Sequence, residues 1–559
     1  MFVKKSWSTK QKNPKPQYQI VESYRDPETN IPKHRAIMNI TSLPEETIEA
    51  ITLSLKGEKL TSLGNISISV GDAYRGAGTL CVYRLWKKQN MDKIVPFLSP
   101  AERESLFAMV LQRILEPGSK LALKEQLADS IISKIFSKKR LDEDELYDVM
   151  DKLYENFHEV QKRLLEANND SNTLLLYDIT STYFEGTKAE DGKHGHSRDK
   201  RWDRYQIVIG LVCNGEGLPL TIEVWPGNTA DKATVQEQVR MLKDRFGITD
   251  AIIIGDKGMY SKANIDCIVN NGFDYILSVD WQKQRKELLS LQDNQLSLLD
   301  DVGVIEWEEG NARYVGCFSE WRKKRQIRQR IEGIKDSKKA LDRLKETASN
   351  GRYYSWVSLR KKVDNILSKH KVSRLWNIEI IPLEEGKKPE EKSPFDIRCT
   401  INGQAVKERK RLEGKFLLET SVKSQVKTAK EIKKTYAEQQ KIERAFRNIK
   451  SYLEIRPVYH RKERRVKAHV LICFLSYYLV KRAEMEFREN GITREAVRVI
   501  RDWDKLKFTK VTLEAKGDVI EEWQWQMGEM GHRIQKEISA LGWWKSIESY
   551  KRSLLARLD

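Results

Sequence analysis

Two apolar runs that each carry an aspartate constrain the fold of this chain most strongly. Asp178 lies in the run LLLYDIT, and Asp256 directly follows the run AIIIG. Both runs have the length and composition of buried β-strands. A carboxylate where a buried strand runs out is costly unless it binds something positive. The two aspartates are therefore candidate ligands of a cation.

The residues around these aspartates predict a mixed sheet. Short strands are expected at Leu174–Thr180, Thr182–Glu185, Tyr205–Asn214 and Leu220–Trp225. Val235–Phe246 has the spacing of an amphipathic helix, and Ala251–Gly255 is apolar enough to be buried on both faces. Antiparallel strands, a helix and then a parallel-type buried strand indicate a sheet of the ribonuclease H kind. The expected fold class is therefore mixed α/β, with helices flanking a mixed sheet.

A third acid, Glu443, lies on a predicted helix in the segment YAEQQKIERAFRNIK. One stripe of this helix has core-facing spacing and consists of Ile442, Ala445, Phe446, Ile449 and Leu453. Tyr436, Glu443 and Lys450 lie seven residues apart and form a second stripe at its edge, with Gln439 between the two stripes. An ordinary charged helix also has a polar edge, so this stripe gains meaning only beside Asp178 and Asp256.

The same segment resembles the Tyr-x2-Arg-x3-Glu-x6-Lys signature of DDE transposases of the insertion-sequence-four type. Tyr436, Glu443 and Lys450 match the signature, whereas Gln439 replaces its Arg, and Arg444 or Arg447 are candidates to compensate. The blocks YDITSTYFEG, GHSRDKRWDRYQIVIGL, IIIGDKGMYS and RPVYHRKERRVKAHVLICFL resemble the other family motifs. The resemblance implies a ribonuclease H-like catalytic core split by a β-rich insertion domain between the second Asp and the Glu.

The resemblance also implies the chemistry of the site. Asp178, Asp256 and Glu443 are expected to hold two Mg²⁺ ions, with Mn²⁺ as a substitute and Asp178 bridging both. Water is expected to cut the DNA at the element ends, and the freed 3′-hydroxyl then attacks target DNA. Tyr436, Lys450 and Lys257, the residue after Asp256, are expected to contact phosphates.

A basic segment after this helix predicts a further phosphate contact. The segment opens the next predicted helix and carries His460, Arg461, Arg464 and Arg465. A helix N-terminus with basic side chains binds phosphate readily. The alternative is a solvated run of charges.

The charge balance favours a polyanionic partner. The chain has 100 Lys+Arg against 81 Asp+Glu, which gives a net charge of +19. Double-stranded DNA, as element ends and target, is the expected partner, although a merely basic surface is the alternative. The longest apolar run, Val470–Val480, is far shorter than the roughly 20 residues of a membrane span. The six scattered cysteines and a start without an apolar signal segment predict a cytoplasmic protein without zinc.

Six regions are expected along the chain. They are an N-terminal strand and helix region that could bind element ends (1–95), a helical region (96–169), the first part of the catalytic core (170–272), the insertion domain (273–428), the second part of the core (429–490) and a C-terminal helical region that could oligomerise (491–559). Within the insertion, Trp321–Asn350 is a predicted helix dense in Lys and Arg, which either contacts DNA or is a solvated face. Four tryptophans there are candidates for base stacking or for core packing: Trp307, Trp321, Trp356 and Trp376.

Three functions remain open at this point. The leading prediction is an insertion-sequence transposase that acts as a homodimer in a synaptic complex. The alternatives are a metal-dependent nuclease of the same fold that never joins DNA, and a DNA-binding protein that has lost catalysis. The presence of all three acids in their expected contexts argues against the last alternative.

Overall fold

The computed structural model describes residues 1–7, 16–27, 30–58, 66–135, 142–168, 174–186, 188–310, 312–351, 354–384, 390–515 and 518–556. These residues form two compact units. The smaller unit comprises residues 1–76 and 506–534, and the larger unit comprises residues 77–505 and 535–559. Because the smaller unit combines an N-terminal segment with a segment near the C-terminus, it is not contiguous along the chain.

The smaller unit contains two antiparallel sheets. In the first sheet, β2 (Pro16–Arg25) pairs with β3 (Pro32–Asn39), and β1 (Phe2–Trp7) pairs with β2 on its other side. Helix α1 spans Glu45–Leu55. The second sheet has the order β18-β17-β4, with β4 at Ile66–Arg75, β17 at Lys507–Ala515 and β18 at Asp518–Trp525. The β17–β18 hairpin was not predicted, because only helices were expected near the C-terminus.

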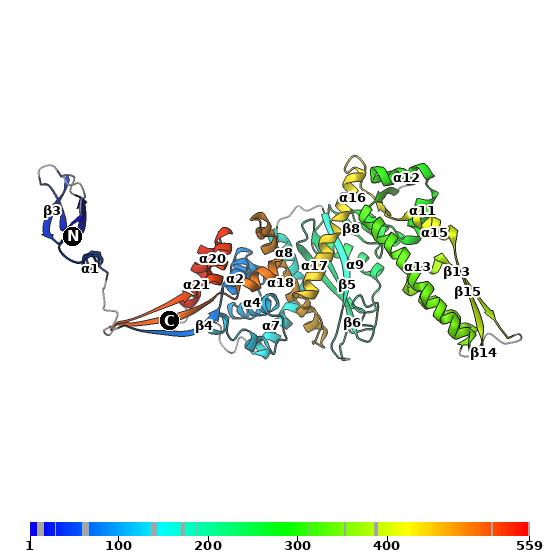
Figure 1. Ribbon diagram of the computed structural model, residues 1–559, viewed down its shortest axis with the longest axis horizontal. Coiled ribbons are helices and arrows are strands. Elements are labelled where there is room, and N and C mark those ends of the chain that lie inside the picture. The colour runs from blue at the N-terminus through cyan, green and yellow to red at the C-terminus, as the bar shows by residue number, and fades with distance from the viewer. Residues whose placement is uncertain are drawn as a thin grey trace. The chain divides into compact units, whose positions relative to one another are not determined.

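The larger unit is built around an eight-stranded mixed sheet of order β10-β11-β16-β9-β8-β5-β6-β7 (Figure 1). Its strands, in chain order, are β5 (Leu174–Tyr183), β6 (Gln206–Asn214), β7 (Pro219–Pro226), β8 (Ile252–Gly255), β9 (Asp274–Ser278), β10 (Val304–Glu309), β11 (Ala312–Phe318) and β16 (Lys415–Thr420). Strands β5, β6 and β7 are antiparallel, α9 (Asp231–Asp244) follows, and β8 then pairs parallel to β5. The predicted mixed α/β fold class and its ribonuclease H-like strand order are confirmed.

The part of the chain between β9 and the helix of Glu443 divides into sheet and insertion. Strands β10, β11 and β16 extend the central sheet, and Phe318 at the end of β11 faces Lys415 at the start of β16. The chain between these facing residues forms α13 (Glu320–Ser349), α14 (Trp356–Lys369), the hairpin of β13 (Trp376–Pro382) and β15 (Phe395–Ile401), and α15 (Gly403–Leu412). Before β10 lie α11 (Trp281–Ser290) and α12 (Asp293–Val302). The predicted basic helix is α13, and its start is capped by the Ser319 hydroxyl, which accepts a hydrogen bond from the Arg322 amide.

A helical layer packs beside the sheet. Its helices include α2 (Ala77–Lys88), α4 (Pro100–Leu115), α7 (Glu143–Glu155), α8 (Phe157–Asn168), α18 (Glu463–Glu489), α19 (Ala496–Trp503) and α21 (Trp544–Leu555), whereas α20 (Glu529–Ala540) is divided between the two units. Helix α4 begins at a capping box of Ser99 and Glu102 with Pro100 in its first turn, and it ends at Leu115, two residues before Pro117. Helix α18 is buried through most of its length and packs against α4, α7, β7 and α17 (Gln439–Ser451). The apolar run Val470–Val480 is thus the centre of a core, and among the described helices none combines the length and apolarity of a membrane span.

The helix predicted to carry Tyr436, Glu443 and Lys450 is interrupted, which corrects the expected single helix. Helix α16 spans Ala429–Ala437, and α17 begins after Glu438. At the junction the Glu438 amide bonds to the Thr435 carbonyl at 3.1 Å and the Lys441 amide bonds to the Glu438 carbonyl at 2.8 Å. These i to i+3 bonds tighten the chain as in a 3₁₀ turn. The core stripe of α17 is buried as predicted, from Ile442 to Ile449.

Candidate active site

The three acids line one cavity of about 810 Å³, here called the acid cavity. Asp178 lies on β5, Asp256 follows the end of β8, and Glu443 lies on α17. Strands β5 and β8 are parallel neighbours in which Leu176 pairs with Ile254, and continuing this register places Asp178 level with Asp256. Helix α17 packs against β5 and brings Glu443 to the same cavity. Sheet register and helix packing thus unite three acids that are far apart in the sequence.

The acids destabilise one another's charge. The pKa of Asp178 is raised to about 7, first by burial and then by the negative charges of Asp256 and Glu443. The backbone amide of Ile179, which donates to Asp178 Oδ1 at 2.8 Å, and the nearby Arg198 oppose this rise. On Asp256, Oδ1 accepts a hydrogen bond from the Gly258 amide at 2.8 Å. Repulsion that exceeds local compensation favours the binding of a cation between the acids.

The donor chemistry of the acid cavity fits a divalent cation. Its three carboxylates offer the oxygen ligands that Mg²⁺ prefers. Within the described part of the chain, however, no group of three or more His, Cys, Asp and Glu side chains is close enough to hold a metal ion. Ligation of one ion by all three acids therefore requires these side chains to move closer together.

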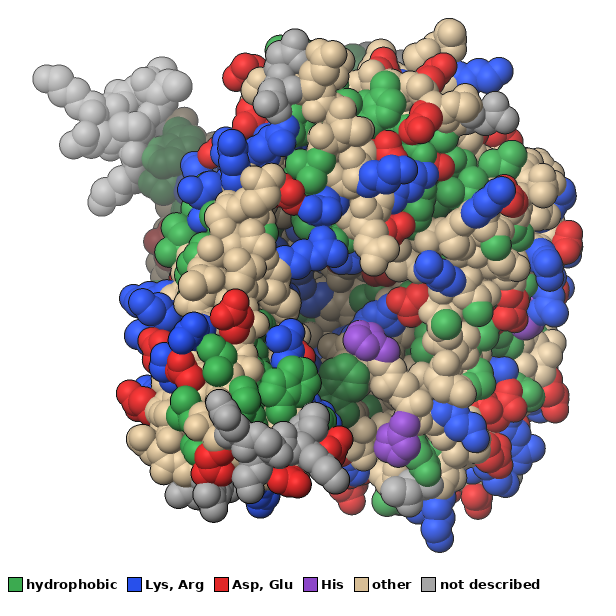
Figure 2. Space-filling view, turned by 90° about the vertical axis from the view of Figure 1, so that its right-hand side faces the viewer, with side chains coloured by type: hydrophobic (Ala, Val, Ile, Leu, Met, Phe, Trp, Pro, Cys, Tyr) green, Lys and Arg blue, Asp and Glu red, His purple; other side chains and the backbone are tan. Residues whose placement is uncertain are grey.

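Basic side chains from three helices also line the acid cavity. They are Arg322 and Arg325 of α13, Lys433 of α16, and Arg444 and Arg447 of α17. Gln326 and Gln329 continue the α13 contribution with helical spacing. On the side of the molecule that carries α11, α15 and the β13–β15 hairpin, Lys and Arg side chains surround a central hollow (Figure 2). Basic side chains beside a cluster of acids suit a polyanionic substrate, with a cation bound between the substrate and the acids.

Comparison with known proteins decides the family. Residues 170–479, more than half of the chain, match the family model for the transposase DDE domain. This chain belongs to the DDE transposase family. Residues 3–63 match a second model, that of the IS1634 family transposase N-terminal domain. The predicted DDE family is therefore confirmed, whereas the N-terminal match names a different subtype from the predicted insertion-sequence-four type.

Two solved structures show distant similarity to this DDE transposase. One is a cryo-EM structure of the piggyBac transposase synaptic complex with hairpin DNA, at 10% identity and a TM-score of 0.37, with 78% of this chain and 82% of that chain covered. The other is the Mos1 transposase paired-end complex with left transposon end, at 16% identity and a TM-score of 0.14, with 32% and 59% covered. No curated protein matches the chain significantly.

The residues predicted to contact DNA near the acids are either buried or exposed. Tyr436 and Gln439 are buried and line the acid cavity together with Glu443. Tyr436 packs on Phe416, with ring centroids 6.3 Å apart, and burial raises the pKa of its phenol to about 12. Arg444 and Arg447, the predicted substitutes for the family Arg, are exposed and also line the cavity. Lys257 is exposed and does not line it.

Lys450 lies apart from the acid cavity of the DDE domain. Its ammonium binds Asp199 Oδ1 at 2.9 Å, and the Arg456 guanidinium contacts the same oxygen. Asp199 is almost fully buried, and burial lowers the pKa of Lys450. A carboxylate of the chain itself therefore occupies two cations, one of which was predicted to contact phosphate.

The predicted basic segment is divided between surface and interior. Arg464 and Arg465 pair with Asp151 at 3.2 and 3.6 Å, and Arg461 is exposed. His460 is largely enclosed and lines a different cavity, away from the acids. The segment is thus neither a uniform phosphate site nor a simple solvated run.

The four candidate tryptophans of the insertion differ in their surroundings. Trp376 is buried and donates to the Ser337 hydroxyl at 3.0 Å, and Trp307 stacks on Tyr314 at 5.7 Å, so both pack in the structure. Trp321 is 67% exposed and lines the acid cavity, while Trp356 is 41% exposed and begins α14. Residues at the start of α13 therefore face the acids, which the charge density of this helix alone did not specify.

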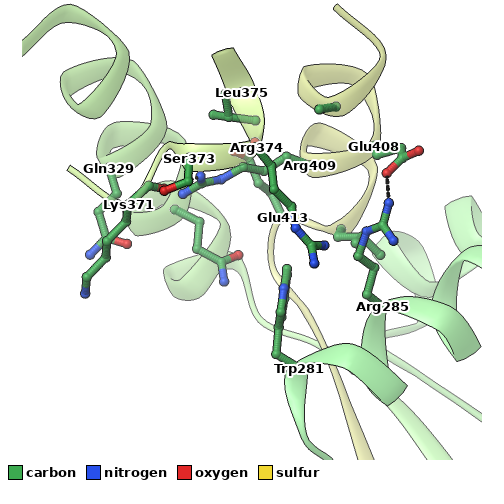
Figure 3. Close-up of a pocket in the computed structure, with 13 residues that line it drawn as sticks. Trp281, Arg285, Gln329, Lys371, Ser373, Arg374, Leu375, Glu408, Arg409 and Glu413 are labelled. Carbon is green, nitrogen blue, oxygen red and sulfur yellow. Dashed lines mark hydrogen bonds and ion pairs between the residues drawn. The ribbon is translucent and has the colours of Figure 1, made fainter. Parts of the chain in front are cut away.

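A neighbouring cavity of about 420 Å³ was not predicted from the sequence. It shares Gln326 and Gln329 with the acid cavity and is lined by basic side chains, among them Lys371, Arg374 and Arg409. Trp281 stands from α11 toward these side chains, and Arg285 beside it pairs with Glu408 (Figure 3). The isolated position of Trp281 in the sequence gave no signal, because its basic neighbours come from other elements.

Proposed function

We propose that this chain is the transposase of an insertion sequence, which cuts DNA at the element ends and joins the 3′-hydroxyls to target DNA. The observation that carries the proposal is that Asp178, Asp256 and Glu443 line one cavity together with five basic side chains. The DDE domain match supports the reaction class. The N-terminal match favours an element of the IS1634 family over the insertion-sequence-four type.

In this proposal the three acids hold two divalent ions, with Mg²⁺ expected and Mn²⁺ as a substitute. The chemistry that such bound ions supply is activation of the attacking oxygen and stabilisation of the leaving 3′-oxygen. Arg322, Arg325, Arg444 and Arg447 bind phosphates of the DNA along the cavity wall. Tyr436 donates a hydrogen bond to a phosphate, and Gln439 orients the strand beside it.

The partners follow from the reaction. Two element ends must be held together, so the active form is proposed to be a homodimer in a synaptic complex with double-stranded DNA. Residues 1–95 are proposed to contact the element ends, since they contain the part that matches a transposase N-terminal domain. Residues 491–559 are proposed to contribute to oligomerisation.

The test uses the purified full-length chain with DNA of its element ends, a target plasmid and Mg²⁺. The parent protein is expected to cut and to join. Asp178→Asn is expected to retain DNA binding and to lose both steps. The control is Asp266→Asn, which makes the same change at an exposed position on α10 (Lys262–Asn270) and is expected to behave as the parent.

The outcomes separate the alternatives. Cutting without joining favours the nuclease of the same fold. DNA binding without either step favours the catalytically silent DNA-binding protein. Undiminished cutting by Asp178→Asn removes this acid from the proposed metal site.

A further inference from the structure

A second basic cavity, of about 490 Å³, lies in the helical layer of the larger unit and is here called the cation cavity. It is bounded by the end of α4 and the loop after it, by Tyr147 of α7, by the connection between α17 and α18, and by α18 itself. Its cationic or ionisable nitrogen-bearing residues are Arg113, Lys120, Arg456, His460 and His469. Within the described chain, the residues that line this cavity and the acid cavity do not overlap.

Lys120 is the most unusual residue of the cation cavity. It is only 3% exposed, and its ammonium forms no hydrogen bond with any described residue. An ammonium taken from water without a partner is strongly unfavourable. Either this group gives up its proton, or an anion that enters the cavity pairs with it.

The neighbours of Lys120 add unpaired polar atoms instead of compensating charge. Arg113 is 6% exposed; its terminal nitrogens donate to the carbonyls of Gly118, Leu453 and Glu454, while its Nε has no partner. His469 Nε2 lies 3.2 Å from the Ile455 carbonyl, and its Nδ1 is buried without a partner. Three buried nitrogen-bearing side chains with unpaired atoms therefore line one cavity.

The electrostatic field in the cation cavity is positive. Burial lowers the pKa of His460 to about 3, with further lowering by the charges of Lys120, Arg113 and Arg465. Burial and Arg113 likewise hold the pKa of Lys120 well below its usual range. Among the lining residues, Glu454 carries the carboxylate, and it is exposed. Two other carboxylates nearby already form ion pairs: Asp199 pairs with Lys450 and Arg456, and Asp151 pairs with Arg464 and Arg465. The nearby carboxylates thus leave Lys120 uncompensated.

We propose that the cation cavity binds a phosphate group through the unpaired ammonium of Lys120, beside the unpaired Nε of Arg113 and Nδ1 of His469. A cavity of this size holds much more than one water molecule or a chloride ion. An ammonium without a hydrogen-bond partner beside an unpaired guanidinium Nε offers donors to the several oxygens of a phosphate. The source of the phosphate is either the backbone of bound DNA, which rests on the proposed function, or a small free phosphate.

The position of the cavity favours the DNA backbone as the source. The connection that carries Arg456 and His460 is hydrogen-bonded to the end of β5, the strand of Asp178: the Val458 amide donates to the Tyr183 carbonyl and the Glu185 amide donates to the Val458 carbonyl, both at 2.9 Å. Exposed Tyr459 lies at the same cavity, and exposed Arg461 directly follows His460. A DNA strand that crosses this surface can place one phosphate at the cavity while another part reaches the acid cavity.

The first test measures thermal unfolding of the full chain in inorganic phosphate and in chloride at equal ionic strength. Phosphate is expected to raise the Tm of the parent by about 2 °C or more over chloride at saturation. Lys120→Met is expected to lose this phosphate-specific rise and, in chloride alone, to melt no lower than the parent because a buried unpaired ammonium is removed. The matched control is Lys124→Met, which changes an exposed lysine paired with Asp142 outside the cavity and should keep the rise.

The second test measures duplex DNA affinity as a function of salt for the same three proteins. If DNA is the source, Lys120→Met weakens binding several-fold and reduces the slope of log affinity against log salt by about one, whereas Lys124→Met leaves both nearly unchanged. A phosphate-specific rise with unchanged DNA binding supports the site but assigns it to a free phosphate. A DNA effect without the phosphate rise supports a phosphodiester site.

The proposal is overturned if Lys120→Met changes neither the phosphate-specific Tm rise nor DNA binding relative to Lys124→Met. Neither measurement requires cutting or joining. Failure of the transposase proposal and failure of this site are therefore distinguishable.

Discussion

At the scale of single residues, burial and pairing decide which charges are available to a substrate. The three acids were predictable because each stands out against an apolar or helical pattern, as Asp178 does in LLLYDIT. The ion pair of Lys450 with Asp199 was not predictable, because Asp199 lies in a polar segment without a periodic pattern. Lys120 was missed for the opposite reason, since a lysine in a turn gives no sign that it is buried. A sequence pattern thus identifies a charged residue within an apolar or periodic segment. It does not predict ion pairs between residues that folding brings together.

Asp199→Asn is expected to lower the free energy of unfolding by about 3 kcal/mol, because it leaves Lys450 and Arg456 without the carboxylate that compensates them. Urea unfolding of the full chain measures this change. Asp203→Asn, in the same loop but exposed and paired with Arg201, should change the stability by less than about 1 kcal/mol. Equal stability of the two variants would show that the Asp199 cluster is not structurally important.

His460 is expected to make folding sensitive to acid. Its pKa is lowered to about 3 in the folded chain, against about 6.5 when unfolded, so between these values the unfolded state binds more protons. Stability contributed by neutral His460 is therefore present above about pH 6.5 and is lost as the pH falls toward 3. The Lys120, Arg113 and Arg465 charges around it all oppose protonation.

His460→Gln should remove this contribution. The difference in unfolding free energy between the parent and His460→Gln is expected to change by up to about 1.4 kcal/mol per pH unit between pH 6 and pH 4. Denaturant unfolding in phosphate-free buffer measures it. A difference that stays constant over this range contradicts the enclosed, neutral state of His460.

At the scale of elements, the structure refines the helices that face the acids. Strand order and the burial of Ile442–Ile449 follow the sequence pattern, because apolar periodicity directly reports which face is covered. The break at Glu438 does not, since Ala437, Glu438, Gln439 and Gln440 are all residues that favour a continuous helix. Likewise, the charge density of α13 does not reveal which of its faces meets the acid cavity.

Arg325→Ala is expected to weaken DNA binding several-fold and to reduce its salt slope by about one, because Arg325 lies on the face of α13 that lines the acid cavity. Salt-dependent binding to duplex DNA measures both quantities. Lys324→Ala is the neighbouring control, since Lys324 is exposed, pairs with Glu320 and lies outside the cavity. If the two variants bind DNA alike, the helix acts only through its total charge.

At the scale of the whole molecule, the C-terminal part of the chain completes both units. Strand β17 pairs with β4 from the N-terminal part and with β18 on its other side, while α21 packs against α2 in the larger unit. Residues 491–559 were predicted to form a helical region that could oligomerise. Trp543 is 1% exposed and packs against Trp503 and Phe487, with Arg84 over its ring at 4.1 Å. Such long-range pairing is not readable from local pattern, because each partner alone is an ordinary short element.

Trp543→Ala is expected to destabilise the chain by about 3–5 kcal/mol through the cavity it leaves in this core. Trp544→Ala, at the next position, should cost clearly less because Trp544 is only half-buried. Chemical unfolding of both variants compares them under one condition. Similar losses for the two would place the C-terminal core elsewhere than around Trp543.

The pairing of Phe318 with Lys415 has a consequence for how proteins of this kind diversify. The segment between these two residues leaves the sheet and returns to it at one pair of facing residues, as the loop of a hairpin does, whatever its length. Selection can lengthen, shorten or replace that segment, and with it the arginines proposed to bind DNA, while the strands bearing Asp178 and Asp256 keep their register. The strands that carry the acids and the inserted segment can thus evolve at different rates although they join one continuous sheet.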